Sequence, residues 1–380
     1  MLKVLNVNTS IDLRRGGGTA ERTFQMSRHI GKESDIECTV LTLDIDITQS
    51  RLESLYPARV VLVRCIWERF YIPLPQLTRI RDLVANADIV HLMGHWSVLN
   101  IIVYFACRSL NKPYVVCPAG TLPIFGRSKL FKKTYNILIG KNIIRDAAAC
   151  IAVTTAERDD FREYGVNPRN VIVIPNGVNP QDFPEVDKDV FLGKFGLRGV
   201  PFLLFMGRLN LIKGPDILLE AFVNIADAHP DLHLVFAGPD EGMLRTLMRS
   251  ASAAGLVDRI HFVGYLMGDD KSAAYRTAKL LVVPSRHEAM SIVAVEAGIC
   301  CLPVLLTDQC GFSEVREVDV RLEVPATKEG VALGLTSLLN TGATLPALSE
   351  KWGAFVRRNF TWSNLGPRYY QLYRIILASW

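Results

Sequence analysis

Short runs of aliphatic and β-branched residues alternate along the chain with longer stretches in which apolar residues recur every three or four positions. The short runs predict buried strands and the longer stretches predict amphipathic helices, because these are the periods of the two structures. This alternation is typical of parallel sheets with crossover helices. We expect strands at residues 3–7, 36–42, 60–63, 88–92, 114–117, 149–153 and 171–174, and again at 202–206, 232–237, 260–263, 280–283 and 303–306.

The alternation stops near the middle of the chain, where prolines and glycines interrupt a charged segment. Such residues are typical of connections, so we expect the chain to pass here from one domain to the next. The predicted organisation is an N-terminal Rossmann-like domain at residues 1–180, a linker at 181–200 and a second Rossmann-like domain at 201–360. The aromatic segment 361–380 predicts a C-terminal helix that packs back on the N-terminal domain.

The predicted fold class is therefore α/β, with two doubly wound domains in tandem. Ligands of open parallel sheets bind beyond the carboxyl ends of the strands. We expect the two sheets to face each other across a cleft, so functional residues should follow directly after strands.

The composition agrees with two well-cored domains, because 49% of the 380 residues are hydrophobic and 21% are charged. This excludes an intrinsically disordered chain and a small disulfide-stabilised protein. The cysteines form no C-x-x-C pair and most lie in apolar runs, which favours buried free thiols. The first residues are too polar for a secretory signal, so we expect a cytoplasmic protein.

The net charge of +5 is unevenly distributed. Residues 1–180 carry 23 Lys and Arg against 16 Asp and Glu, a net charge of +7, whereas residues 181–380 carry 20 against 22, a net charge of −2. The basic first half suits an anionic ligand, an anionic polymer or a membrane surface, and charge alone does not choose among them.

A first candidate site is the run Gly16-Gly17-Gly18, between the first predicted strand and a helical pattern that begins near Thr19. Glycines here let backbone N–H groups approach a phosphate at a helix N-terminus. The run does not match the G-x-G-x-x-G fingerprint, so an NAD-dependent dehydrogenase is unsupported. These residues alone do not distinguish a phosphate-binding loop from a plain loop.

A second candidate site follows the strand predicted at 202–206. Arg208 lies just beyond this strand, and Lys213 comes shortly before a helix predicted to begin at Pro215. Two cations beside a helix N-terminus predict an anion site. The alternative is a solvated surface pair.

A third candidate site is the segment 288–296, which begins and ends with glutamate. It follows the strand predicted at 280–283, and Ser291 is expected to cap the helix that contains Glu296. A carboxylate inside an apolar stretch needs a partner, and vicinal ribose hydroxyls are suitable partners. An ordinary intramolecular ion pair is the alternative for Glu296.

In this order and on this scaffold, the motifs resemble those of the retaining glycosyltransferases of family 4, which have the GT-B architecture of two Rossmann-like domains around a cleft. The resemblance covers nearly the whole chain. It rests on the glycine run, the junction sequence at 173–178, Gly207-Arg208-Leu209 with Lys213-Gly214, Ala237-Gly238-Pro239-Asp240, and the two glutamates with seven residues between them.

The resemblance implies that Arg208 and Lys213 hold the diphosphate of a nucleotide-sugar donor, that Glu288 contacts the donor sugar and that Glu296 contacts the ribose. Fixed cations stabilise a departing diphosphate without a metal ion or cofactor. In this family the departing phosphate oxygen is usually taken to accept the acceptor's proton, so no protein nucleophile is required. Arg208, Lys213 and Glu288 are thus the expected catalytic residues. The expected donor-binding groups also include the backbone amides of Gly17, Gly18, Ser291 and Ile292.

The sequence Asp44-Ile45-Asp46 imitates the metal-binding D-x-D of the other large glycosyltransferase fold. It follows the strand predicted at 36–42, in the first domain and away from the predicted phosphate site. We therefore interpret it as a pair of loop acids and predict no metal site.

The chain departs from the family pattern on the side where the acceptor is expected. Family members often carry His where this chain has Ala119, beside Gly120, and a second His where it has Met93. His91 and His95 are candidate substitutes on the acceptor side, although a packed or surface histidine is an equal alternative for each. These departures motivate a second hypothesis, a catalytically silent nucleotide-sugar-binding partner protein.

A basic amphipathic segment lies at residues 127–145. Such a pattern is typical either of a helix with a solvated face or of a segment that contacts an anionic membrane peripherally. The segment and its flank interleave Lys129, Lys132, Lys133, Lys141 and Arg145 with Phe125, Leu130, Phe131, Ile137, Leu138 and Ile139.

The sequence thus predicts a metal-independent, retaining hexosyltransferase that moves a sugar from a nucleotide-diphosphate sugar to a saccharide or lipid-linked saccharide. The expected setting is cell-surface polysaccharide or glycolipid synthesis, in the cytoplasm or at the inner face of the cell membrane. A nucleic-acid partner would rest on charge alone and is not expected.

Overall fold

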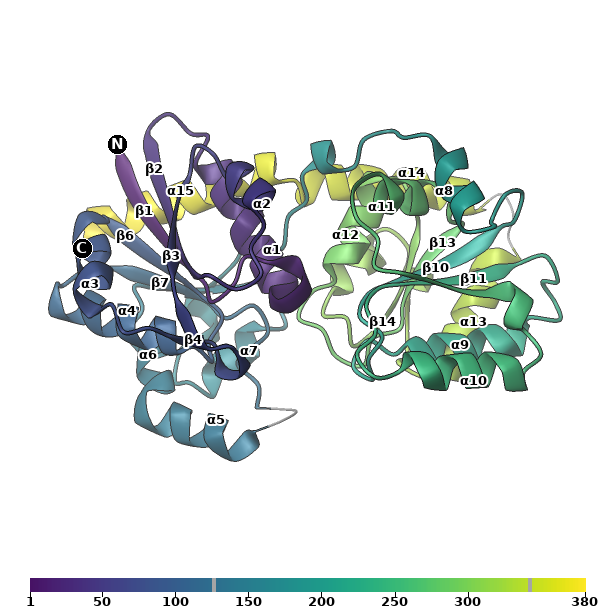
Figure 1. The fold of residues 1–380 in the computed structure, drawn as a ribbon, viewed down its shortest axis with the longest axis horizontal. Coiled ribbons are helices and arrows are strands. Elements are labelled where there is room, and N and C mark those ends of the chain that lie inside the picture. The colour runs from purple at the N-terminus through teal and green to yellow at the C-terminus, as the bar shows by residue number, and fades with distance from the viewer. Residues whose placement is uncertain (125–127, 341–343) are drawn as a thin grey trace. The chain divides into compact units, whose positions relative to one another are not determined.

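The computed structural model describes residues 1–124, 128–340 and 344–380. It divides into two compact units, the first formed by residues 1–177 and 362–380 and the second by residues 178–361. Each unit is built on its own parallel sheet with helices packed against it (Figure 1). The predicted pair of parallel-sheet α/β domains is therefore confirmed.

The sheet of the first unit has seven parallel strands in the order β3-β2-β1-β6-β7-β8-β9. Every strand expected in this half is present, with ends within one residue of those expected. This accuracy is understandable, because strands buried on both faces are continuous apolar runs in the sequence. The strands are β1 Leu2–Val7, β2 Ile36–Leu43, β3 Arg59–Val63, β6 Ile89–Met93, β7 Tyr114–Cys117, β8 Ala149–Ala152 and β9 Val171–Val173.

Helices of the first unit connect these strands, and the C-terminal helix α15 packs against α1. α15 therefore belongs to the first unit although its sequence follows the second. The segment after β7 forms α5, a π-helical turn and α6 in direct succession. The helices are α1 Leu13–Ile30, α2 Gln49–Glu53, α3 Leu77–Asn86, α4 Val98–Ser109, α5 Lys129–Tyr135, α6 Lys141–Arg145, α7 Arg158–Arg162 and α15 Trp362–Ser379, with the π-helical turn at Asn136–Gly140.

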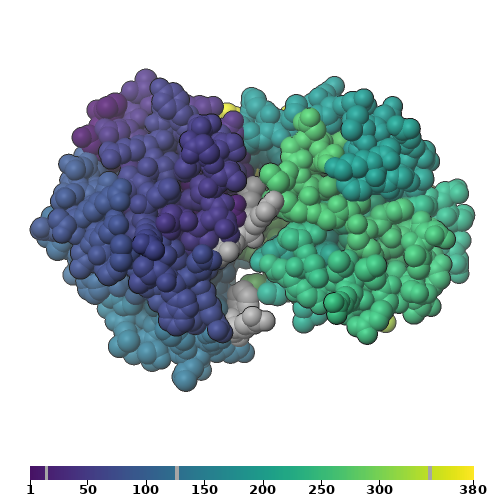
Figure 2. Space-filling model, viewed as in Figure 1, coloured from purple at the N-terminus to yellow at the C-terminus, as the bar shows by residue number. Residues whose placement is uncertain are grey.

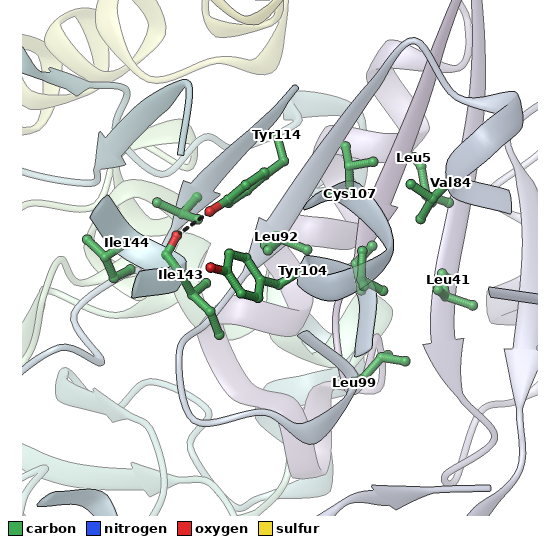
Figure 3. Packing of buried hydrophobic residues seen from close by; sticks show 14 of the residues in the cluster. Leu5, Leu41, Val84, Leu92, Leu99, Tyr104, Cys107, Tyr114, Ile143 and Ile144 are labelled. Carbon is green, nitrogen blue, oxygen red and sulfur yellow. Dashed lines mark hydrogen bonds between the residues drawn. The ribbon is translucent and has the colours of Figure 1, made fainter. Parts of the chain in front are cut away.

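The core of the first unit is formed by side chains from its strands and from α3, α4 and α6 (Figure 3). The Tyr114 hydroxyl is buried in this core, where it donates a hydrogen bond to the carbonyl oxygen of Ile143 at 2.9 Å. Pairing of this kind removes the cost of burying a hydroxyl. The labelled core residues are Leu5, Leu41, Val84, Leu92, Leu99, Tyr104, Cys107, Tyr114, Ile143 and Ile144.

One element of the first unit was not predicted. The chain that leaves β3 forms a small antiparallel hairpin, β4 Cys65–Trp67 and β5 Ile72–Pro73, with a short 3-10 turn at Glu68–Phe70 between the strands. The hairpin forms a two-stranded sheet of its own, separate from the seven-stranded sheet. Its strands are too short to show an alternating pattern in the sequence.

The sheet of the second unit has six parallel strands in the order β12-β11-β10-β13-β14-β15. The five strands expected here are present, and the two-residue β15 at the edge was missed. The strands are β10 Phe202–Met206, β11 His233–Ala237, β12 Ile260–Gly264, β13 Leu280–Val283, β14 Val304–Thr307 and β15 Glu323–Val324, and the helices are α8 Lys188–Lys194, α9 Pro215–Ile225, α10 Leu244–Ala253, α11 Gly268–Thr277, α12 Ile292–Ile299, α13 Lys328–Leu339 and α14 Thr344–Asn359.

The segment 181–200, which we expected to be a linker, is part of the second unit. It contains α8, which packs against α11. Phe191 and Leu197 are buried there. The prolines and glycines that suggested a linker therefore punctuate a short helix that is anchored by two apolar side chains.

The cysteines are free thiols, and all but Cys65 and Cys301 are buried, as their apolar sequence surroundings predicted. Burial raises the pKa of several of them, for example that of Cys38 to about 12. Within the described residues, no helix is long and apolar enough to cross a membrane.

Candidate functional site

The loop that follows β10 carries the two predicted cations of the second unit. Arg208 Nη1 lies 3.0 Å from Glu241 Oε1, and Asn210 Nδ2 donates to the other oxygen of that carboxylate at 2.6 Å. Asn210 Oδ1 accepts from the backbone N–H of Lys213 at 3.0 Å. The loop is thus held in one shape, with Arg208 exposed and paired with Glu241.

Two glycines let this loop pack directly on neighbouring backbone. Gly238 (φ +150°) lies against the carbonyl oxygen of Gly207, and Gly214 (φ +67°) lies against that of Pro284. A Cβ atom at either position would overlap the carbonyl oxygen. Gly214 also stands at the N-cap of α9, which begins at Pro215. Only glycine adopts this geometry without strain, so these positions fix Lys213 beside the carboxyl end of β13.

Lys213 and Glu288 meet at the carboxyl ends of the neighbouring strands β10 and β13. Lys213 Nζ lies 2.7 Å from Glu288 Oε1, and the side chains are 25% and 8% exposed, respectively. Ser285 Oγ donates to the same carboxylate, and the backbone N–H of Glu288 donates to the carbonyl oxygen of Gln309 at 2.9 Å. The carboxylate is therefore held by Lys213 and Ser285, and the Glu288 backbone by Gln309, whereas the lysine retains contact with solvent.

A further ion pair, which the sequence reasoning missed, joins the Glu288 loop to the first turn of α9, directly after Lys213 and Gly214. Arg286 donates to both oxygens of Asp216, at 2.8 and 2.6 Å. Its hydrogen bonds to Asp216 raise the pKa of Arg286. Arg286 also binds the loop that carries Arg208 and Lys213. Its backbone N–H donates to the carbonyl oxygen of Ile212 at 2.7 Å, and its side-chain Nη1 donates to that of Leu211. A planar, bidentate pair of this kind makes Arg286 a positioning residue for the site.

Helix α12 begins directly after the Glu288 loop. Ser291 occupies the N-cap position, but its side chain makes no capping hydrogen bond, which corrects the expected cap. The hydroxyl is buried and has no hydrogen-bond partner among the described residues. The first N–H groups of the helix, starting at Ile292, have no intrahelical partner and carry the positive end of the helix dipole. The N-terminus of α12 can therefore accept an anionic group.

Glu296 lies within α12 and is 7% exposed. Its Oε1 is 2.8 Å from Lys271 Nζ, and its Oε2 accepts from the Tyr275 hydroxyl at 2.7 Å. Burial raises the pKa of Tyr275 well above its usual value, and the Glu296 carboxylate raises it further. The intramolecular ion pair that the sequence left open is thus present with Lys271, and Tyr275 adds a hydrogen bond; the sequence reasoning named neither of these α11 side chains.

In the first unit, the three glycines lie inside α1 rather than in a loop ahead of it. The backbone leaves helical geometry at Gly17 (φ +55°, ψ −142°), so the helix is kinked there. In the part of the chain that the structure describes, no atom lies within 4 Å of the position that a Gly17 Cβ would occupy. The helix is thus interrupted within the glycine run that the sequence singled out.

His91 and His95 are packed inside the first unit. His91 Nδ1 lies 2.7 Å from the Tyr373 hydroxyl of α15, and His95 Nε2 lies 2.8 Å from Asn136 Oδ1. Burial lowers the pKa of His91 to about 3 and that of His95 to about 4, so both rings are neutral. Of the alternatives that the sequence left open, the structure shows packed histidines.

Ala119 and Gly120 form a turn after β7 with φ of +51° and +79°. The N–H of Gly120 donates to Glu157 Oε1 at 2.5 Å, and the N–H of Val153, after β8, donates to Oε2 at 2.7 Å. Glu157 is buried, which raises its pKa to about 7. One carboxylate therefore holds two neighbouring loops at the carboxyl edge of the sheet, and only the structure reveals it, because Val153 and Gly120 are distant in sequence.

Two further expectations concern Asp44 and Met93. Asp44 Oδ1 accepts from the backbone N–H of Cys65 at 2.7 Å, so this acid fixes the start of the β4–β5 hairpin. Met93 is buried at the end of β6. Among residues 1–124, 128–340 and 344–380, no group of three or more His, Cys, Asp or Glu side chains could hold a metal ion.

Solved structures place this fold in a known class. Anabaena Alr3699/HepE in complex with UDP and glucose matches with a TM-score of 0.80 and 16% identity, over 98% of this chain and 99% of that chain. A sucrose-phosphate synthase from Thermosynechococcus elongatus matches with a TM-score of 0.77 and 18% identity, over all of both chains. The two parallel-sheet α/β units are those of the GT-B fold.

The sequence specifies the family. Residues 16–182 match the model of Glycosyltransferase Family 4, and residues 188–357 match that of Glycosyl transferases group 1. The chain belongs to this glycosyltransferase family. The D-inositol 3-phosphate glycosyltransferase of Rhodococcus opacus is 28% identical over 250 residues, which are 63% of this chain and 56% of that protein. The match therefore spans only about half the length of this curated relative.

Proposed function

We propose that this chain is an active, retaining, metal-independent hexosyltransferase that transfers a sugar from a nucleotide-diphosphate sugar to a saccharide or lipid-linked saccharide. The reaction would serve the synthesis of a cell-surface polysaccharide or glycolipid. The observation that carries the proposal is the contact between Lys213 and Glu288 beside the N-terminus of α12, at the carboxyl ends of β10 and β13. A cation, a carboxylate and free helix N–H groups together match a sugar diphosphate.

The chemistry of this arrangement is electrostatic. Breaking the bond between the anomeric carbon and the phosphate leaves negative charge on the diphosphate. Lys213, Arg208 and the N–H groups at Ser291 and Ile292 stabilise that charge in place and need little reorganisation, because the loop is already held by hydrogen bonds. The departing phosphate oxygen accepts the proton of the acceptor hydroxyl.

The glutamates take different roles in this proposal. Glu288 would accept hydrogen bonds from the donor sugar hydroxyls, since its carboxylate is already oriented by Ser285 and Lys213. Glu296 would bind the ribose hydroxyls while Lys271 and Tyr275 hold it in place. A carboxylate has about four lone-pair directions, so two protein partners leave capacity for a ligand. Gly17 and Gly18 would offer backbone amides to the phosphates.

The neighbour in complex with UDP and glucose makes UDP-glucose the first donor to test. Binding is measured by thermal shift with UDP-, GDP- and ADP-sugars, and chemistry by release of free sugar from the donor. The Lys213→Ala variant should release sugar at least about a hundred-fold more slowly, because removing one group that stabilises transition-state charge costs about 10² to 10³ in rate. The Arg208→Ala and Glu288→Ala variants should also lose turnover and remain folded. Turnover should persist in EDTA.

The exposed Lys188, at the start of α8, supplies the control. Lys188→Ala should behave as the wild type, since it removes the same charge outside the site. Sugar release by Lys213→Ala at the wild-type rate would refute the phosphate assignment. A chain that binds the donor but releases no sugar and glycosylates no acceptor would instead be the silent binding partner that Ala119 and Met93 suggested.

The proposal includes peripheral contact with an anionic membrane through α5 and the π-helical turn. Leu130 and Phe131 are 79% and 62% exposed, and Ile137 and Leu138 are 80% and 71% exposed. Lys129 and Lys133 are exposed on the same segment, whereas Ile139 packs against the core. Phe125 and Arg127, which the sequence included in this surface, lie outside the described residues. Exposed apolar side chains beside lysines suit an anionic lipid surface at the inner face of the cell membrane.

A further inference from the structure

The β4–β5 hairpin is a second place where the first unit exposes large apolar side chains. Ile66 and Trp67 are each 54% exposed, and Phe70 is 42% exposed. Leu74 and Leu77, which follow the hairpin, are 38% and 59% exposed. Five such side chains within twelve residues exceed the scattered apolar exposure that is normal on a soluble protein.

The exposed side chains are held in place by the rest of the hairpin. Cys65 and Tyr71 pack against the core of the first unit, which leaves Ile66, Trp67 and Phe70 on the outside. The rings of Trp67 and Phe70 form an edge-to-face pair with centroids 4.7 Å apart and an interplanar angle of 77°. The apolar surface is therefore preformed, so a partner need not supply the free energy to order it.

Cations flank this surface. The Arg69 guanidinium carbon lies 5.5 Å from the centre of the Phe70 ring. Arg64, Arg79 and Arg81 are also exposed, and the sequence between residues 64 and 82 contains only two acids, Glu68 and Asp82. The hairpin and its flank thus combine aromatic rings with a net positive charge.

We propose that the β4–β5 hairpin is a second lipid-contacting element, in which Trp67 and Phe70 enter the boundary between headgroups and acyl chains of an anionic bilayer. Arg64 and Arg69 bind the phosphates of the headgroups. This inference rests on the proposed membrane contact of α5 and adds an element that is independent of it in sequence. In Figure 1 the hairpin and α5 both lie in the lower part of the first unit.

The chemistry of the surface favours lipid over a second protein or a free saccharide. Trp residues gather at the boundary of a bilayer because the ring is apolar and its N–H is polar. Arg pairs with phosphate through several N–H groups at once, and it remains charged at any physiological pH. The aliphatic side chains of Ile66, Leu74 and Leu77 match acyl chains and offer nothing to sugar hydroxyls. Figure 2 shows blue atoms, a colour range that includes this part of the chain, over much of the visible face of the first unit.

The test uses the full chain with vesicles of phosphatidylcholine, with and without phosphatidylglycerol. The Trp67→Ala/Phe70→Ala double variant should bind the anionic vesicles about ten-fold more weakly than the wild type, because the two aromatic rings proposed to enter the bilayer are removed. A Leu130→Ala/Phe131→Ala variant probes α5, and Leu333→Ala, which truncates a 71% exposed side chain on α13, is the matched control. Every side chain altered in these variants is exposed, so folding should be unaffected.

Quenching by brominated acyl chains shows whether Trp67 itself enters the bilayer. The fluorescence of the wild type should be quenched on anionic vesicles, and Trp67→Phe should bind equally well but lose most of that quenching. Equal quenching in Trp67→Phe, or wild-type vesicle binding by the double variant, overturns the inference. Self-association that is lost in the double variant, without vesicle binding, would show a protein interface instead.

These outcomes separate the inference from the proposals on which it rests. If the α5 variant loses binding and the hairpin variant does not, only the hairpin proposal fails. If the wild type binds no anionic vesicles at low salt, both membrane proposals fail. Release of sugar from the donor should be unchanged in every hairpin variant, because Arg208, Lys213 and Glu288 lie in the second unit, so the transferase proposal is tested separately.

Discussion

Protonation of Glu157, in the first unit, should change the free energy of unfolding measurably. Burial raises its pKa to about 7 from the ordinary value of 4.5, despite hydrogen bonds from Val153 and Gly120 and the nearby Arg22 guanidinium; Asp160 adds to the rise. The folded state therefore binds the proton more tightly than the unfolded state. The free energy of unfolding should fall as pH rises from about 4.5 to about 7, by at most on the order of 3 kcal/mol, and then level off.

The Glu157→Gln variant tests this directly. Its amide does not titrate, so the difference in free energy of unfolding between wild type and variant should change between about pH 4.5 and pH 7. The variant also turns an N–H₂ group toward one of two backbone donors, so amide exchange at Gly120 or Val153 should accelerate. Denaturant unfolding and hydrogen exchange measure the two effects. A difference that stays constant with pH would contradict the raised pKa.

Gly214 is a single backbone position that fixes the conformation of the loop carrying Arg208 and Lys213. It has φ of +67° and lies against the carbonyl oxygen of Pro284. Gly214→Ala should therefore displace the loop, cost about 2 to 4 kcal/mol of stability and abolish the donor-induced thermal shift, because Lys213 is the adjacent residue.

Gly255 gives the matched comparison for that substitution. Its φ is +69°, nearly that of Gly214, but no atom of the described residues lies within 4 Å of the position that its Cβ would occupy. Gly255→Ala should cost only about 1 kcal/mol, from the left-handed conformation alone, and leave donor binding intact. Thermal denaturation with and without donor measures both variants. Equal effects of the two substitutions would show that close approach to Pro284 is not what fixes the loop.

The elements that the sequence predicted well are those that a continuous apolar run defines. Strands such as Leu280–Val283 are buried along their length, so their boundaries follow the hydrophobicity. The hairpin at 65–73 was missed because its strands are short and its apolar residues face outward. The linker expected at 181–200 was misplaced, since prolines and glycines mark turns within a domain as readily as turns between domains.

The candidate site was predictable to a similar degree. The residue types of Lys213 and Glu288, and their place after strands, were enough to expect them at one sheet edge. Their contact depends on β10 and β13 being neighbours, which is a property of strand order and not of either motif. The partners Arg286 and Lys271 escaped notice because charged residues on loops and exposed helix faces are common, and only tertiary packing selects the few that pair.

At the scale of the whole molecule, most of the residues proposed to bind the donor belong to one of the two units. The second unit is one continuous segment, residues 178–361, and it contains Arg208, Lys213, Glu288 and Glu296. The first unit needs both ends of the chain, because α15 packs against α1 and its Tyr373 contacts His91. The basic excess of the sequence lies in this first unit, whereas most of the residues proposed to bind the donor diphosphate belong to the second.

This division predicts that residues 178–361, expressed alone, fold and bind the nucleotide diphosphate. Their affinity should lie within about ten-fold of that of the full chain, since only the proposed amides of Gly17 and Gly18 are lost. The fragment should transfer no sugar, because the acceptor side is missing. Circular dichroism and titration calorimetry measure folding and binding, and the Lys213→Ala fragment is the control. A folded fragment that binds no nucleotide would show that the first unit supplies most of the donor affinity, and would move the centre of the proposed site from β10 and β13 to the glycine kink of α1.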